Sequence, residues 1–243
     1  MTRPPIRGVL FDKDGTLLDF DATWPPAYRA VAEELAALAG DPGLAARILR
    51  LGGYGEGGAL DPSSVFACGT TREIVEFCVR LPELEGVEGI AARADGIFTR
   101  FGERGPPAID NLAGLLEGLG LRGLRLGLAT NDSIASTKAW LAYNGFEGLF
   151  DFVSGYDSGY GPKPDPAVFD AFCAATGLAP GAVCMVGDAV TDAELARAAG
   201  AGLSVIVQSG VDVGDALAAM ADVVISSVAE LGDVIERFDQ GLS

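Results

Sequence analysis

IRGVLFDKDGTL, at residues 6–17, joins a short apolar run to a group of charges that begins where the run ends. Residues 6–11 are mostly apolar and have the length of one buried strand. Asp12 and Asp14 follow two positions apart, so their side chains point to the same side while the backbone stays extended. Gly15 then permits a tight turn and lets backbone N–H groups approach an anion. The stretch predicts a strand that carries two carboxylates at its carboxyl end.

Similar apolar runs alternate with longer helix-like segments over most of the remaining chain. The expected strands are 6–11, 124–129, 152–154, 182–186, 203–207 and 223–225, and the expected helices among them are 133–144, 166–176, 192–199 and 229–238. Near-continuous apolar strands separated by helices indicate a parallel sheet that is covered on both faces. We therefore expect an α/β protein with a doubly wound, Rossmann-like core.

The segment 20–107 departs from this alternation. Its helical patterns are 28–39, 44–51, 71–80 and 89–104, it shows no convincing strand, and proline pairs stand near its ends at 25–26 and 106–107. We interpret it as an all-helical cap domain inserted after the first strand. This assigns residues 1–19 and 108–243 to the α/β core.

The charge balance limits the classes of partner. The chain has 34 acidic and 17 basic residues, a formal net charge of -17, and such a surface repels nucleic acid and anionic lipid. An anionic substrate would therefore need positive charge supplied locally. We find neither an apolar stretch of membrane-spanning length nor a signal-peptide core, and the four scattered cysteines fit reduced, buried thiols. We expect a cytoplasmic protein; the sequence does not indicate its oligomeric state.

The sequence contains no histidine, which excludes a Ser-His-Asp or Cys-His nucleophile and a His-containing zinc site. Acid–base work must fall to carboxylates, lysine, tyrosine or metal-bound water. Asp12 and Asp14 cannot both ionise easily without a cation, and Mg²⁺, which prefers oxygen ligands, would relieve their repulsion. Taken alone, the pair is equally consistent with a polar turn of no catalytic meaning.

Polar residues also follow two other expected strands. Thr130 and Asn131 come after the strand 124–129, and Asp188 and Asp192 come after the next strand but one. Ligands bind at the carboxyl ends of the strands in an open parallel sheet, so chemistry is expected there. Considered separately, Thr130 fits a helix cap or a packing residue, and capping explains one of the two aspartates.

Lys163 lies between Pro162 and Pro164. The following proline biases the lysine toward an extended backbone, and a lysine on a stiff backbone suits a point charge aimed at phosphate or carboxylate. An exposed loop lysine is the simpler interpretation when this segment is considered by itself.

Together, these segments resemble the haloacid dehalogenase-like (HAD) hydrolase superfamily. The matching residues, in the family's order, are Asp12-Lys13-Asp14-Gly15-Thr16, then Thr130, then Lys163, then Gly187-Asp188 with Asp192. The inserted helical segment matches the family's cap. Within the superfamily, the DKDGT opening and the stretch 130–133 look like phosphoglycolate phosphatase and its relatives.

The resemblance implies a Mg²⁺-dependent phosphatase for a small phosphorylated metabolite, with phosphoglycolate as the first candidate. It implies that Asp12 is the nucleophile that forms a phosphoaspartate and that Asp14 is the general acid and base. The implied Mg²⁺ ligands are Asp12, Asp14 through its backbone carbonyl, Asp188 and Asp192. The implied phosphoryl-binding groups are Thr130, Lys163 and backbone N–H groups near Gly15 and Asn131.

The resemblance also implies that the cap acts as a lid and contacts the organic part of the substrate. Candidate contacts are the glycine-rich stretch 52–58 and the turn 69–72, where Arg72 could bind a carboxylate or simply be solvated. Two alternative functions remain open: a phosphotransferase or sugar phosphate mutase on the same scaffold, and a non-catalytic phosphate-binding protein.

Overall fold

A computed structural model of the chain describes residues 3–55, 57–208 and 214–242. Its centre is a six-stranded parallel sheet of β1 (Gly8–Phe11), β2 (Arg125–Ala129), β3 (Phe152–Ser154), β4 (Val183–Gly187), β5 (Leu203–Val207) and β6 (Val223–Ile225). The strand order is β3-β2-β1-β4-β5-β6. From β1 the chain adds β2 and β3 on one side, and it then crosses to add β4, β5 and β6 on the other side. Ligand-binding crevices form where the strand order reverses in this way.

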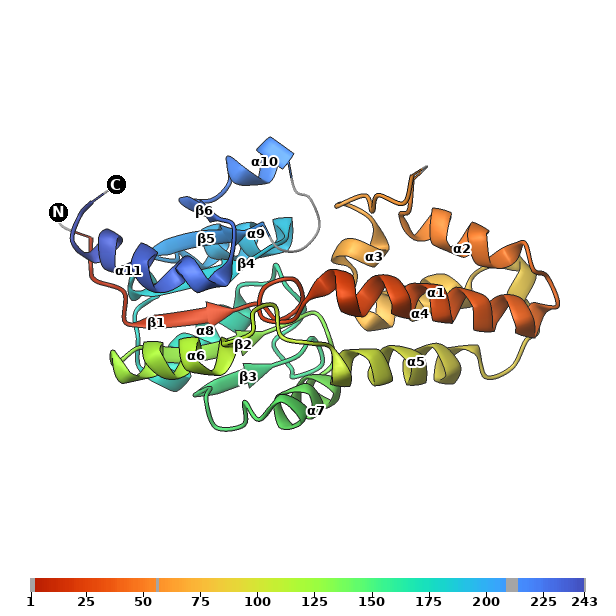
Figure 1. Cartoon of the computed structure of the whole chain (residues 1–243), viewed down its shortest axis with the longest axis horizontal. Coiled ribbons are helices and arrows are strands. Elements are labelled where there is room, and N and C mark those ends of the chain that lie inside the picture. Colours follow the sequence, from red (N-terminus) through yellow and green to blue (C-terminus); the bar gives the residue numbers. More distant parts are fainter. Residues whose placement is uncertain (1–2, 56, 209–213, 243) are drawn as a thin grey trace.

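Helices cover both faces of the sheet (Figure 1). Val9 and Phe11 of β1 belong to one buried cluster and Leu10 belongs to another, as the alternation of side chains along a strand requires. The first cluster includes residues of α6 (Leu112–Leu121), α7 (Ile134–Asn144) and α11 (Leu231–Asp239), and the second includes residues of α8 (Ala167–Thr176) and α9 (Val190–Ala199). The predicted doubly wound α/β core is confirmed.

The helices between residues 20 and 104 lie beyond the carboxyl ends of the strands, and both chain ends lie at the opposite end of the molecule (Figure 1). These cap helices are α1 (Phe20–Ala39), α2 (Leu44–Gly52), α3 (Val65–Cys68), α4 (Thr71–Val79) and α5 (Ile90–Arg104). Helix α1 packs against α2 and α5, and α5 also packs against α7. The described residues of this segment contain no strand.

Helix α1 begins earlier than expected. The side chain of Asp19 accepts a 3.0 Å hydrogen bond from the N–H of Ala22, which caps the helix ahead of Phe20. Pro25 and Pro26 therefore lie inside the helix, and the expected helix start at residue 28 was wrong. Proline removes helical N–H donors, but this helix buries a broad apolar face that offsets the loss.

Three short helices were not expected from the sequence. Helix α6 has the sequence LAGLLEGLGL, in which three glycines weaken the helical pattern although Leu112, Leu116 and Leu119 are buried. Helices α3 and α10 (Gly214–Ala218) have four and five residues, too few to show a periodicity. Single 3₁₀ turns occur at Pro82–Leu84, Pro180–Ala182 and Val228–Glu230. Within the described ranges, no helix combines the length and apolarity needed to cross a membrane.

Candidate active site

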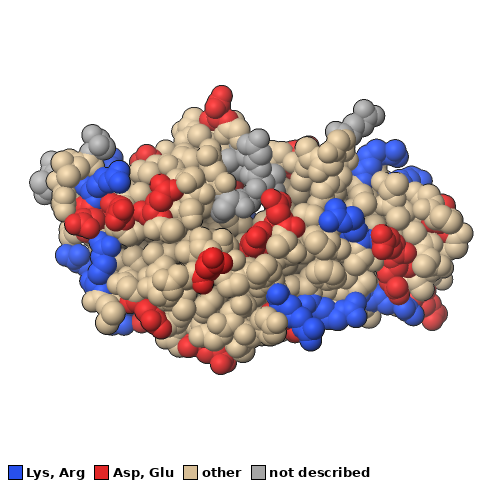
Figure 2. All heavy atoms as spheres, viewed as in Figure 1, with Lys and Arg blue, Asp and Glu red and all other residues tan. Residues whose placement is uncertain are grey.

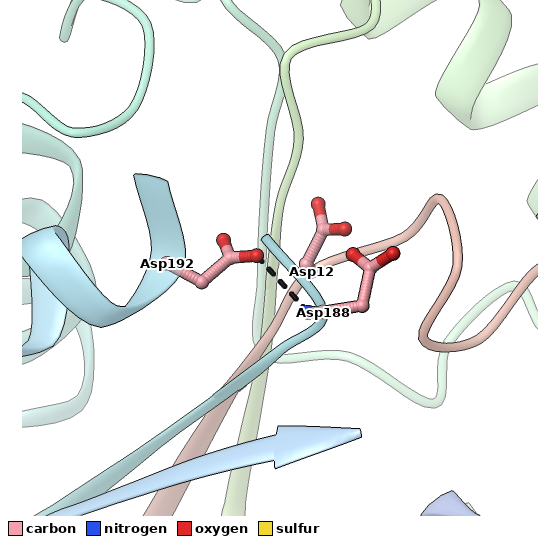
Figure 3. A group of neighbouring side chains, drawn as sticks. All are labelled: Asp12, Asp188 and Asp192. Carbon is pink, nitrogen blue, oxygen red and sulfur yellow. Dashed lines mark hydrogen bonds between the residues drawn. The ribbon is translucent and has the colours of Figure 1, made fainter. Parts of the chain in front are cut away.

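Three buried carboxylates meet at the carboxyl ends of the two central strands (Figure 3). Asp12 follows β1, Asp188 follows the adjacent strand β4, and Asp192 lies in the first turn of α9. Each contributes one oxygen to a group in which all the oxygens lie within 4.8 Å of one another. This cluster lies where the strand order reverses, between β1 and β4.

Asp192 is fixed by the turn that leads into α9. Its Oδ2 accepts hydrogen bonds from the N–H groups of Asp188 at 3.2 Å and Ala189 at 3.0 Å (the former is dashed in Figure 3). A Cβ at position 187 would overlap the Asp192 carboxylate, so the glycine there allows this close approach. Asp192 therefore caps the first turn of α9, and its carboxylate also belongs to the group of three buried carboxylates. Capping alone would not require a position beside the other two.

Lys163 links two of the carboxylates. Its Nζ donates to Oδ1 of Asp12 and to Oδ1 of Asp192, the latter at 2.7 Å, and its side chain is buried. Its backbone N–H donates to Oδ1 of Asn131 at 2.9 Å, so Asn131 helps to hold the loop in place. Burial lowers the pKa of Lys163, but Asp12 and Asp192 outweigh it and the pKa lies above its usual value. The lysine is therefore a permanent positive charge in the cluster, rather than an exposed loop residue.

The cluster carries more negative charge than Lys163 balances. Burial raises the pKa of Asp12 to about 7, and the neighbouring carboxylates of Asp192 and Asp14 add to the rise while Lys163 opposes it. Burial, followed by Asp12 and Asp192, raises the pKa of Asp188 well above its ordinary value. A divalent cation would relieve this repulsion. The donors are carboxylate oxygens within reach of one ion, so the residues present fit Mg²⁺.

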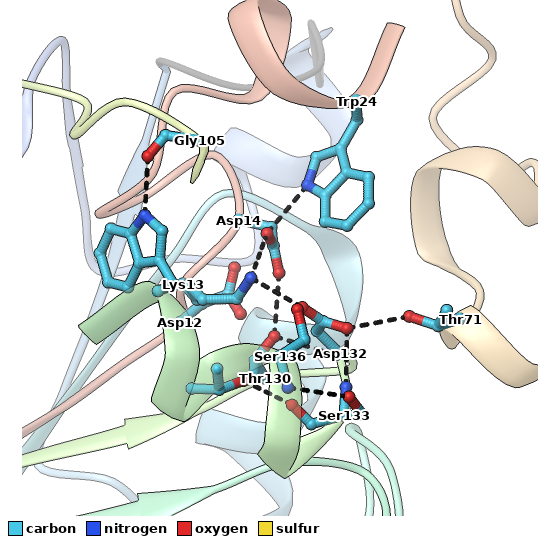
Figure 4. Close-up of polar contacts among 12 residues, drawn as sticks. Asp12, Lys13, Asp14, Trp24, Thr71, Gly105, Thr130, Asp132, Ser133 and Ser136 are labelled. Carbon is cyan, nitrogen blue, oxygen red and sulfur yellow. Dashed lines mark hydrogen bonds and ion pairs between the residues drawn. The ribbon is translucent and has the colours of Figure 1, made fainter. Parts of the chain in front are cut away.

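Asp14 has partners on both oxygens (Figure 4). Oδ1 accepts a 2.8 Å hydrogen bond from Nε1 of Trp24 and lies 2.9 Å from Nζ of Lys13. Oδ2 accepts a 2.9 Å hydrogen bond from the hydroxyl of Thr130, which itself accepts the N–H of Asp132 at 3.0 Å. Thr130 thus lies beside the carboxylate pair, with its hydroxyl oriented toward Asp14.

Lys13 and Asp132 form a buried ion pair that sequence reasoning missed. Nζ of Lys13 lies 2.9 Å from Oδ2 of Asp132 and over the rings of Trp24 and Trp140, 5.6 and 6.0 Å from their centroids. Asp132 also accepts a 3.1 Å hydrogen bond from the hydroxyl of Thr71, in cap helix α4 (Figure 4). The position of a lysine next to Asp14 was a signal of local pairing, since its Nζ lies 2.9 Å from Oδ1 of that residue, but it did not indicate the pair with Asp132.

Gly15 is required by the crowding around Asp188. Its φ is +85°, and a Cβ there would overlap the carboxylate of Asp188. Its N–H donates a 2.9 Å hydrogen bond to the carbonyl of Leu18, so this N–H is engaged within the turn. A role for Gly15 in binding phosphate stays a prediction.

A cavity of about 70 Å³ opens between these residues and the cap helices. Asp12, Asp14, Asn131, Lys163 and Asp188 line it from the core side. From the cap side it is lined mainly by Phe20, Trp24, Tyr28, Phe66, Thr71, Ile74 and Phe98. These five residues implied by the resemblance therefore face a common space with the cap helices, whereas Gly15, Thr130 and Asp192 do not line it.

The expected cap contacts divide into two groups. Gly69 and Thr71 line the cavity, whereas Arg72 lies with its guanidinium 5.6 Å from the ring centroid of Tyr156 and does not line it. Gly53, Tyr54 and Gly55 border a separate surface hollow, and no described residue of the stretch 52–58 lines this cavity; Glu56 lies outside the described residues. An Arg72 contact with substrate is likewise not supported.

Comparisons with known proteins find related sequences and structures. A family model of haloacid dehalogenase-like hydrolases matches residues 6–200. A phosphoglycolate phosphatase of Cereibacter sphaeroides is 34% identical over 194 residues, 79% of this chain and 81% of that protein. One of Shigella flexneri is 28% identical over 233 residues, 93% of this chain and 91% of that protein.

Solved structures show the same fold. A structure described as a predicted phosphoglycolate phosphatase from Haemophilus somnus superposes with a TM-score of 0.70 at 22% identity, covering 96% of this chain and 99% of that one. A HAD phosphatase from Thermococcus onnurineus also gives a TM-score of 0.70 at 22% identity, covering 95% and 98% of the two chains.

Proposed function

The chain belongs to the haloacid dehalogenase-like hydrolases, and on that premise we propose that it is a Mg²⁺-dependent phosphatase that hydrolyses a small phosphate monoester through a phosphoaspartate at Asp12. The observation that carries the proposal is the convergence of Asp12, Lys163, Asp188 and Asp192 from three separate segments. The names of the relatives make phosphoglycolate the first substrate to test.

The chemistry follows from the charges in the site. A phosphate monoester resists attack because both partners are anionic, so neutralisation and positioning provide most of the catalysis. An oxygen of Asp12 attacks phosphorus, and the leaving oxygen takes a proton from Asp14 as the ester bond breaks. Asp14 then removes a proton from water, which attacks the acyl phosphate and regenerates Asp12 with release of phosphate. Lys163, already beside Asp12, neutralises charge on the phosphoryl oxygens.

Mg²⁺ would be held by Asp12, the backbone carbonyl of Asp14, Asp188 and Asp192, and would supply positive charge to the phosphoryl group. Thr130 and the backbone N–H groups near Asn131 would bind the phosphoryl oxygens. For Thr130 this requires its hydroxyl to turn from Asp14 or to bind by a second contact, because it donates to Asp14 in this structure.

We assign residues 20–107 to a cap and residues 1–19 and 108–243 to the catalytic core. Closing the cap excludes water, which would strengthen the electrostatic interactions in the site. The hydrogen bonds from Trp24 to Asp14 and from Thr71 to Asp132 connect the cap helices to the core in this arrangement. A cytoplasmic location and the absence of nucleic-acid and membrane partners stay predictions.

The test is phosphate release from a panel of small phosphate monoesters, with Mg²⁺ and after chelation. We expect release that requires Mg²⁺ and falls by about 10³-fold or more in Asp12→Asn, because removing a covalent nucleophile leaves only binding and electrostatic effects. Asp151→Asn is the matched control, since this carboxylate pairs with Arg125 on the surface. Normal turnover by Asp12→Asn would disprove the nucleophile, and an isomerised product without free phosphate would indicate a mutase.

A further inference from the structure

The cap side of the cavity is predominantly aromatic. Five aromatic residues and Ile74 line it together with the smaller Ala67, Cys68, Gly69 and Thr71; the aromatic residues are Phe20, Trp24, Tyr28, Phe66 and Phe98. Their polar atoms already have partners within the protein: Nε1 of Trp24 donates to Asp14, and the hydroxyl of Tyr28 donates to the carbonyl of Phe66 at 2.6 Å. This wall therefore offers mainly apolar contact to the group attached to the phosphate.

No arginine lines this cavity within the described ranges, and Lys163 is the one lysine that does. All the arginines between residues 20 and 107 are exposed: Arg29, Arg47, Arg50, Arg72, Arg80, Arg93, Arg100 and Arg104. Figure 2 shows basic side chains on the outer surface of the cap end. The residues outside the described ranges include neither lysine nor arginine. A substrate carboxylate pointing toward the cap would therefore find no cationic side chain there.

The amino end of helix α4 is already engaged by carboxylates. Such an end attracts anions through its free N–H groups. The N–H of Thr70 donates to Oε2 of Glu73 at 2.8 Å in a capping box, and the hydroxyl of Thr71 donates to Oδ1 of Asp132 at 3.1 Å. These carboxylates oppose a further anion at this end of the helix.

The core side of the cavity is also unfavourable to a second anion. Five carboxylates and two lysines gather there: Asp12, Asp14, Asp132, Asp188 and Asp192 with Lys13 and Lys163. When all are ionised this leaves an excess of three negative charges, of which one Mg²⁺ would offset two. One negative charge still remains before the phosphoryl group adds its own, so an additional substrate carboxylate would be repelled.

On the premise of the phosphatase activity proposed above, we propose that the leaving group of the substrate is uncharged and largely apolar, an aryl or alkyl alcohol rather than a hydroxy acid. The aromatic wall supplies the contact surface for this group. The same wall explains how a chain with phosphoglycolate phosphatase relatives can prefer a different monoester. Selectivity against substrates with a carboxylate would come from the lack of a cationic side chain on the cap side as much as from the apolar contacts.

The test compares near-isosteric substrates in the wild-type protein: phosphoglycolate, its carboxamide, in which –CONH₂ replaces the carboxylate, and phenyl phosphate. We expect kcat/KM to be higher for the carboxamide than for phosphoglycolate by about tenfold or more, and highest for phenyl phosphate. A higher kcat/KM for phosphoglycolate than for its carboxamide would overturn this inference and leave the phosphatase proposal intact. Release of phosphate from none of the three, nor from the wider panel, would instead refute the proposed function.

A gain of specificity provides a second test. Ile74→Lys places an ammonium group on the cap wall, and Ile74→Met is the control of similar size without charge. We expect the ratio of kcat/KM for phosphoglycolate over carboxamide to rise about tenfold in the lysine variant and to stay near the wild-type ratio in the methionine variant. The ratio is taken within one protein, so a partial loss of folded enzyme does not affect it. An unchanged ratio in a folded Ile74→Lys protein would count against the inference.

Discussion

The indole N–H of Trp24, in cap helix α1, donates a 2.8 Å hydrogen bond to Oδ1 of Asp14, in the turn after β1 (Figure 4). The hydroxyl of Thr130 holds the other oxygen of this carboxylate at 2.9 Å. The carboxylate that we propose as the general acid and base is thus oriented from the cap and from the core at once. Its alignment depends on the position of the cap helices.

Trp24→Phe should lower kcat by about tenfold with a smaller change in KM. Phenylalanine retains an aromatic ring on the cavity wall but removes the N–H, and a hydrogen bond to a charged group contributes about 1.5–3 kcal/mol. Steady-state kinetics with the best substrate of the panel, together with a thermal melt, measures the effect.

Trp140→Phe is the matched control for this variant. Trp140 is also buried, also lies over Lys13, and donates its N–H at 2.8 Å to the carbonyl of Gly105 rather than to Asp14. We expect it to lower stability while changing kcat less than Trp24→Phe does. Equal losses of kcat in the two variants would show that the Trp24 bond has no particular role in orienting Asp14.

Lys13→Met should destabilise the protein by about 3–5 kcal/mol, because it removes one partner of a buried ion pair. The lysine side chain is fully buried against Asp14 and Asp132, and methionine preserves most of its length without the charge. Urea unfolding gives the free energy of unfolding. The double variant Lys13→Met/Asp132→Leu should be less destabilised than the sum of the two single variants, since it leaves neither charge of this pair behind.

The destabilisation by Lys13→Met should grow as the pH rises. Burial raises the pKa of Asp132, but Lys13 outweighs it and holds the pKa below its ordinary value of 3.8, so in the wild type this group stabilises the fold above that value and loses its effect in acid. Without Lys13, burial remains and the folded-state pKa rises above the unfolded one, so stability is lost with increasing pH. The difference between the two proteins should be larger at about pH 7.5 than at about pH 4.5. The opposite trend would refute this assignment.

The sheet was predictable because each strand is a short apolar run between helix-like segments. Three expected strands, 152–154, 203–207 and 223–225, match the structure at both ends, and the others differ by one or two residues. The start of α1 was missed because Pro25 and Pro26 signal a boundary locally, whereas burial of the helix overrides that signal. Intrinsic helix propensity does not account for the stabilisation that tertiary packing gives to a helix.

The cluster around Asp12 could be anticipated because its residues follow strands that lie side by side in a parallel sheet. The links between cap and core could not. Trp24 and Thr71 become partners of Asp14 and Asp132 only through the packing of the cap helices. No local sequence pattern indicates how closely these helices approach the core. The orientation of the Arg72 side chain could not be predicted either, because it lies over the ring of Tyr156, which is remote in the sequence.

Mg²⁺ should stabilise the protein through Asp12, Asp188 and Asp192. At about 100 times its Kd, an ion that binds only the folded state adds about 2.7 kcal/mol, visible as a rise in Tm. In Asp188→Asn we expect this rise to be largely lost, while the metal-free protein melts at or above the wild-type temperature because a repelled carboxylate has been removed. An undiminished response to Mg²⁺ in Asp188→Asn would place the ion elsewhere.

Gly15→Ala should weaken Mg²⁺ binding as well as the fold. At φ +85° an alanine is strained, and its Cβ would overlap the carboxylate of Asp188, so that side chain must leave its place beside Asp12. Gly40→Ala is the matched control, because Gly40 has φ +68° at the end of α1 and nothing within 4 Å of a Cβ. Both variants should lose about 1–2 kcal/mol from backbone strain. Only Gly15→Ala should also raise the Mg²⁺ concentration needed for half-maximal activity, because only there does the added methyl group displace a proposed ligand. Equal Mg²⁺ requirements in the two variants would show that the position of Asp188 is not what Gly15 protects.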